Sequence, residues 1–127
     1  MALREARDAR PAEQPEAVLA KATLAAARRL GLTNRELAAV LGTSEASVSR
    51  LSRDRGLRPG SAEGSLALLF VRLFRSLDAI MGGSEASARA WLTAPNRHLG
   101  GVPVERIRAA EGLVNVVQYL DAVRGKL

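Results

Sequence analysis

Residues 33–53 read TNRELAAVLGTSEASVSRLSR, and this stretch decides the fold of the chain. Thr33 followed three residues later by Glu36 is the capping-box pattern that begins a helix. Gly42 supplies the positive φ that a tight turn between two helices requires. Thr43 is the next expected N-cap, with a second helix beginning directly after it. The stretch therefore predicts two short helices joined by a sharp turn.

The apolar residues of this stretch are spaced so that its two helices pack on each other. Leu37, Ala38 and Leu41 form an inward stripe on the first helix, and Val48 and Leu51 form one on the second. This pattern is typical of a helix-turn-helix, which lays its second helix in the major groove of DNA. The alternative is two ordinary helices with a solvated polar face. Caps, turn, apolar core and a basic flank agree, and they favour DNA binding.

The outer face of the second helix and the basic loop after it supply candidate DNA contacts. Glu45 can accept a hydrogen bond from cytosine but repels phosphate, so base reading is assigned to Arg50 with Ser44. The loop arginines suit phosphate contacts, although a solvated surface loop is the alternative. The candidate DNA-binding residues are Asn34, Arg35, Thr43, Ser44, Glu45, Ser47, Ser49, Arg50, Arg53, Arg55 and Arg58.

Composition limits what the chain can be. Its 127 residues are 47% hydrophobic but only 3% aromatic, which favours helices packed through Ala, Leu and Val. The net charge of +6 suits an acidic partner, and nucleic acid is the first candidate. No apolar run is long enough to span a membrane, and the first residues, MALREARDAR, lack a secretory core. We expect an unexported, soluble protein with no membrane contact.

Catalytic and metal chemistry find no support in the sequence. The chain has no cysteine, which excludes disulfides and thiolate metal sites. His98 is the only histidine and has no second metal ligand or nucleophile at a recognisable spacing, so it is expected to be structural or exposed. No glycine-rich phosphate loop follows a strand. The prediction is a protein that is not an enzyme and needs no metal or cofactor.

The chain divides into four segments. Residues 1–15 read as a flexible N-terminal arm, and residues 16–60 as the helix-turn-helix domain with a support helix ending at Gly31. Residues 61–83 form a central apolar helix, and residues 84–127 form a last helical domain. Each boundary follows a change in composition or a Gly or Pro signal.

The central helix is apolar around so much of its circumference that it must be buried on more than one side. One side can serve the core of the chain, and the other a homodimer partner. The alternative is the central helix of a monomer. Dimerisation is favoured because dimeric helix-turn-helix proteins read paired half-sites. The candidate dimerisation residues are Leu66, Leu69, Phe70, Leu73, Phe74 and Leu77.

The last domain contains three further signals. Ser84 caps a short helix that carries Trp91, which is expected in the core. A turn-rich connector, PNRHLGGVP, follows it. Residues 103–124 then read as helical, with a break near Gly112.

The stretch WLTAPNRHLGGVP at residues 91–103 resembles the toxin-binding domain of Xre/MbcA/ParS-type antitoxins, together with Ile107, Gly112, Val116, Leu120 and Gly125. An Xre-like helix-turn-helix in front of that domain is the usual arrangement in this family. The resemblance therefore implies an all-α fold: an N-terminal helix-turn-helix bundle followed by a small helical toxin-binding domain. It also implies that Trp91 and the Pro, Asn and Gly residues of the stretch mainly build the domain.

The resemblance carries implications for function. Such antitoxins work in the cytoplasm of bacteria and pair with RES-domain toxins, which consume or use NAD. The C-terminal region covers the toxin's active-site cleft, and the N-terminal half binds the operator of the operon and represses it. The candidate toxin-binding residues on this chain are Tyr119, Arg124, Lys126 and Leu127. For Arg124 and Lys126 the alternative is ordinary charge at a helix end, and for the protein it is a stand-alone dimeric transcription regulator.

Overall fold

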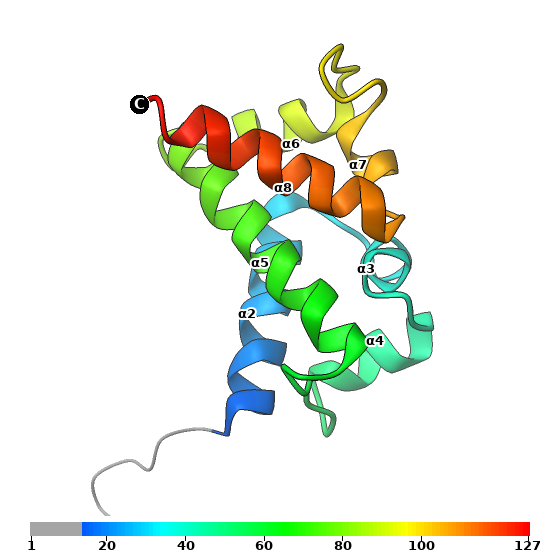
Figure 1. Cartoon of the computed structure of the whole chain (residues 1–127). Coiled ribbons are helices and arrows are strands. Elements are labelled where there is room, and N and C mark those ends of the chain that lie inside the picture. Colours follow the sequence, from blue (N-terminus) through cyan, green and yellow to red (C-terminus); the bar gives the residue numbers. More distant parts are fainter. Residues whose placement is uncertain (1–13) are drawn as a thin grey trace, which may run out of the picture.

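The computed structural model describes residues 14–127, which form seven helices and no strand (Figure 1). The helices are α2 (Pro15–Leu30), α3 (Asn34–Leu41), α4 (Glu45–Leu51), α5 (Ala62–Ile80), α6 (Glu85–Thr93), α7 (Pro103–Arg106) and α8 (Ala110–Arg124). The predicted all-α fold is confirmed. The predicted arm lies outside the described residues, apart from Gln14, which precedes α2, and Pro15, which begins it.

The helix-turn-helix forms as its local signals predict. The side chain of Thr33 accepts from the Glu36 amide at 3.1 Å, and the Glu36 carboxylate accepts from the Thr33 amide at 2.9 Å. Gly42 has φ 69° and ends α3. The prediction for Thr43 is wrong: its amide donates to the Ala38 carbonyl at 3.0 Å, so it still belongs to the end of α3. Ser44 is the actual cap of α4.

α5 runs through the middle of the molecule and packs against α2, α3, α6 and α8 (Figure 1). Phe70, Leu73 and Leu77 are 0% exposed. They therefore cannot be the dimer contacts that the sequence predicts, because α2 and α8 already cover the stripe that they form. The other three predicted dimerisation residues, Leu66, Leu69 and Phe74, are half-buried and pack against the same core.

The break in the C-terminal helical segment comes earlier than predicted. α7 ends at Arg106, the chain turns through residues 107–109, and α8 begins at Ala110. Gly112 lies inside α8, where an added Cβ would be 2.0 Å from the carbonyl oxygen of Arg106. The glycine thus permits the turn to cross closely over the first turn of α8 and does not itself interrupt the helix.

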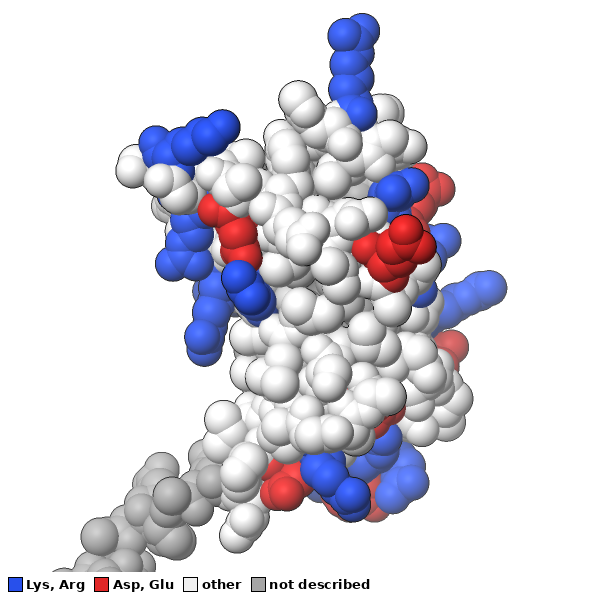
Figure 2. All heavy atoms as spheres, viewed as in Figure 1, with Lys and Arg blue, Asp and Glu red and all other residues white. Residues whose placement is uncertain are grey.

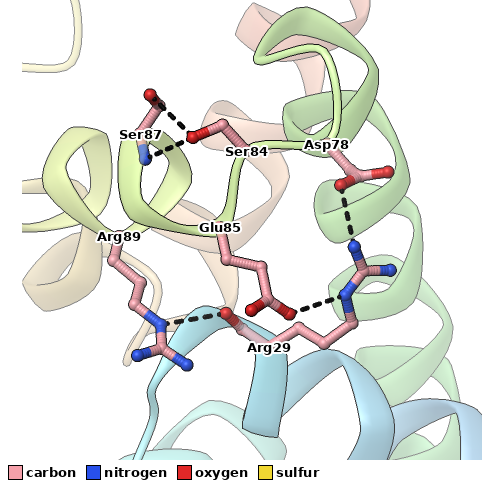
Figure 3. Close-up of polar contacts among 6 residues, drawn as sticks. All are labelled: Arg29, Asp78, Ser84, Glu85, Ser87 and Arg89. Carbon is pink, nitrogen blue, oxygen red and sulfur yellow. Dashed lines mark hydrogen bonds and ion pairs between the residues drawn. The ribbon is translucent and has the colours of Figure 1, made fainter.

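Two arginines join the end of α2 to α5 and α6 (Figure 3). Arg29 contacts Asp78 of α5 at 3.3 Å and Glu85 of α6 at 3.0 Å. In return, Arg89 of α6 donates to the backbone carbonyl oxygens of Arg28 and Arg29, each at 3.0 Å. These carbonyls end a helix and lack partners within it, so a cation is well suited to them. The support helix is therefore bound directly to the C-terminal half.

Candidate nucleic-acid interface and C-terminal surface

The outer face of α4 is exposed. Ser44, Glu45 and Ser49 are exposed there, while Val48 and Leu51 on the opposite face are buried. Beyond them Arg50 is exposed and forms an ion pair with Asp54, with Nε to Oδ1 at 3.3 Å. Exposed pairs at this helical spacing contribute only about 0.3–0.5 kcal/mol. The pair with Asp54 therefore holds Arg50 only weakly.

Arg55 has a different environment from the other loop arginines. Its guanidinium pairs with Glu63 of α5, and the two side chains are only 26% and 19% exposed. This corrects the prediction of a phosphate contact, because Arg55 is used to hold the loop against α5. Arg53 and Arg58 are exposed and form no ion pair within residues 14–127. Both therefore stay candidates for phosphate contacts.

The structure brings part of the candidate set together beside α4. Asn34 of α3 and Ser49 of α4 line one hollow of about 280 Å³, together with Arg28 of α2. Arg28 also lines a neighbouring hollow of about 630 Å³ with Lys21 and Arg53. Lys21 and Arg28 are seven residues apart and share one face of α2. They extend the basic surface next to α4 and were not among the candidates from the sequence.

The remaining candidates lie elsewhere or stabilise the fold. Arg35 is exposed but lines another hollow, of about 380 Å³, with Arg108 from the turn before α8. Thr43 and Ser47 are half-buried, and the Ser47 hydroxyl accepts from that of Ser44 at 3.1 Å within the cap of α4. Thr43 and Ser47 therefore position the helix and present little surface to a ligand.

The candidate residues near the C-terminus fall on two sides of α8. Tyr119 is half-buried and stacks between Trp91 and His98, with ring centroids 6.3 and 5.6 Å away. Arg124 lies about 140° further around the helix and donates to the Ser76 hydroxyl at 3.5 Å. Trp91 is half-buried and packs against the edge of the core, so the prediction of a core residue holds for only part of its ring. The structure thus separates Tyr119 from Arg124.

The final residues extend beyond the last helix. Lys126 and Leu127 are exposed, and the side chain of Leu127 is 79% exposed. Apart from Leu127, the large apolar side chains with the highest exposure are Val18 and Leu68, at 49% and 48%. The tail thus ends in an apolar residue that the described fold does not cover.

A groove of about 760 Å³ lies between α2, α5 and α8. Val18, Leu68 and Val71 supply its apolar lining, while Arg72, Arg75 and Arg124 are among its charged residues. Figure 2 shows Lys and Arg side chains gathered beside the C-terminal end of α8 and where α4 runs into α5, with a largely uncharged surface over α5 between them. The groove therefore combines an apolar floor with a basic border.

Two further properties bear on partner classes. No group of three or more His, Cys, Asp or Glu side chains in residues 14–127 is arranged to hold a metal ion. None of the helices described combines the length and the apolar character needed to cross a membrane.

Comparison with known families agrees with this arrangement. The Antitoxin Xre-like helix-turn-helix domain matches residues 9–72, which is just over half of the chain. The Antitoxin Xre/MbcA/ParS C-terminal toxin-binding domain matches residues 76–126. A search of curated proteins finds no match. The two family matches meet inside α5, which contributes to both. The chain belongs to the antitoxins that join an Xre-like helix-turn-helix to an Xre/MbcA/ParS toxin-binding domain.

Proposed function

We propose that the protein neutralises a cognate RES-domain toxin in the bacterial cytoplasm and represses its own operon. Support for toxin neutralisation comes from the exposed residues after α8, which lie inside or next to the matched toxin-binding domain. Leu127 supplies an apolar tip, and Arg124 and Lys126 supply charge. Such a tail can enter a cleft and exclude substrate by occupying it. The protein acts by binding and performs no catalysis.

Co-expression with the product of the adjacent gene tests this proposal. We expect a stable complex on size-exclusion chromatography with light scattering, and suppression of the neighbour's toxicity. Removing the residues after Asp121 should abolish neutralisation while leaving the helix-turn-helix able to bind DNA. Full neutralisation by the truncated chain contradicts the role of the tail. A chain that forms no complex with its neighbour and still binds DNA is a stand-alone transcription regulator.

Operator recognition is assigned to α4 and the basic surface next to it. Arg50 and Ser49 are exposed on the helix, and Arg28 and Arg53 line the hollows next to it. Arg58 is exposed in the loop that follows α4. A base-reading arginine contributes sequence preference, whereas arginines on phosphates contribute affinity for any sequence. The two roles give different results when DNA sequence and salt concentration are varied.

Arg50→Ala is expected to weaken binding to the operator by about 1–3 kcal/mol and to change binding to unrelated DNA much less. Arg58→Ala should weaken binding to both DNAs alike and reduce the salt slope, d log K/d log[salt], by roughly one unit. Fluorescence anisotropy at several salt concentrations measures both effects. Arg97→Ala, also on an exposed arginine but in the C-terminal half, is the control. Equal losses on both DNAs for Arg50→Ala would place Arg50 on phosphate.

Dimerisation is assigned to the groove between α2, α5 and α8. The apolar stripe of α5 that the sequence predicts as the dimer contact is largely buried in the core. Val18 and Leu68 are the two most exposed large apolar side chains outside the C-terminal tail, and both line this groove. A second copy of the chain that buries the same residues forms a two-fold interface, as paired half-sites require.

A further inference from the structure

Three aromatic rings form a continuous stack on the surface of the C-terminal half. His98, Tyr119 and Trp91 follow one another with centroid separations of 5.6 and 6.3 Å and interplanar angles of 27° and 15°. We name these three residues the aromatic ladder. Trp91 and Tyr119 are half-buried and His98 is exposed. The ladder contains the only Trp, the only Tyr and the only His of the chain.

The connector between α6 and α7 is folded so that it presents one of these rings. Asn96 pairs with Gly101 through two backbone hydrogen bonds, at 2.9 and 3.2 Å, and its side chain accepts from the Leu99 amide at 3.2 Å. Leu99 is buried, whereas its neighbour His98 is exposed and lies on Tyr119. The connector therefore anchors itself through Leu99 and holds His98 on the stack.

The exposed helix neighbours of Trp91 and Tyr119 are uncharged. On α6, Ser87 lies one helical turn before Trp91, and Ala94 follows the end of that helix; on α8, Asn115 and Ala122 each lie about one turn from Tyr119. All four are exposed and small or neutral. The nearest charge along the connector is that of the exposed Arg97, which forms no ion pair within residues 14–127. A stack of three aromatic rings with one arginine beside it suits a protein partner and is poorly suited to DNA phosphate.

The position of the ladder separates it from the other proposed interfaces. Asp121 and Arg124, which line the α2–α5–α8 groove, point to the other side of α8 from Tyr119. A partner on the ladder therefore leaves the dimer groove open. All three ladder residues also lie within the matched toxin-binding domain, and Tyr119 is on the helix that leads into the tail.

We infer that the aromatic ladder is a docking surface for the toxin, separate from the tail that enters its cleft; this inference rests on the proposed function. Trp and Tyr are the residues that most often dominate the affinity of protein interfaces. The ladder fits an apolar, uncharged patch of the toxin outside its active site, bordered by acidic groups opposite Arg97. The ladder supplies affinity, while the tail supplies inhibition.

The test is the affinity of purified full-length variants for the purified product of the adjacent gene, measured by isothermal titration calorimetry. Trp91→Ala and His98→Glu are each expected to raise Kd about 10- to 100-fold. Val114→Ala, at an exposed apolar residue elsewhere on α8, is the matched control and should stay within about twofold. His98→Glu changes an exposed side chain, so it remains informative if Trp91→Ala unfolds the protein.

The outcomes separate this inference from the proposed function. Tight binding by wild type and by both ladder variants overturns the docking role and leaves the antitoxin function intact. A change in the light-scattering mass of the free variants with unchanged toxin affinity also overturns it, because the ladder is then a contact between copies of this chain. No binding by the wild-type chain overturns the proposed function and the docking role together. Weakened binding with unaltered DNA affinity supports the inference.

Discussion

Replacing Gly64 with alanine is expected to lower the free energy of unfolding by about 3 kcal/mol and the melting temperature by on the order of 10 °C. The amide of Gly64 donates to the Ser61 cap of α5, and the loop carbonyl of Arg58 passes directly over it. An added Cβ would lie 1.8 Å from that carbonyl oxygen, so the loop or the helix must move. Thermal unfolding followed by circular dichroism at one protein concentration measures the change.

Gly60→Ala is the matched control for this prediction. It lies in the same loop, its φ is not positive, and an added Cβ would meet no atom within 4 Å. This substitution should leave stability unchanged or raise it by about 0.4–1 kcal/mol, because alanine restricts the unfolded chain. If the two variants melt at the same temperature, the loop does not lie on α5 as described.

Phe70→Ala is expected to cost about 3–5 kcal/mol in the free energy of unfolding, measured by urea titration. The ring is completely buried beneath α2 and α8, where removal leaves a cavity that the packed helices cannot fill. Leu68→Glu, two residues away on the exposed side of α5, should change the stability of the isolated fold by about 1 kcal/mol or less. It should instead convert the proposed dimer into a monomer on light scattering.

The Phe70→Ala and Leu68→Glu variants must be compared with the wild-type chain at one protein concentration, because the stability of a dimer depends on protomer concentration. A small loss for Phe70→Ala contradicts its place in the core. A Leu68→Glu chain that keeps its dimeric mass moves the dimer interface away from the α2–α5–α8 groove. Together, the two substitutions test the buried side of α5 through the free energy of unfolding and its exposed side through the mass in solution.

The helix-turn-helix could be predicted because its signals are local. The capping box of Thr33 and Glu36 acts over three residues, and Gly42 is needed for one backbone conformation. The wrong prediction of Thr43 as the cap of α4 shows the limit of such signals. Thr43 and Ser44 are adjacent and both carry a hydroxyl, so either could have begun the helix. The end of α3 decides between them through the bond to Ala38.

The candidate interfaces were harder to predict because they depend on elements distant in the sequence. Arg55 looks like its neighbours along the chain, and only the position of α5 shows that Glu63 pairs with it. α5 is apolar around most of its surface, so periodicity cannot distinguish Phe70 in the core from Leu68 outside it. Trp91 stacks on Tyr119 of a later helix, a contact that the sequence around Trp91 does not show.

The shared helix α5 has a consequence for engineering and for the evolution of new specificities. No flexible linker separates the DNA-reading half from the toxin-binding half, and Arg29 and Arg89 further tie their helices together. A chimera cut between residues 72 and 76 would join two half-helices whose packing surfaces were selected for different neighbours. A recombinant with a new toxin-binding half therefore needs an α5 whose residues facing α8 match the new α8 and whose residues facing α2 still match the original helix-turn-helix half.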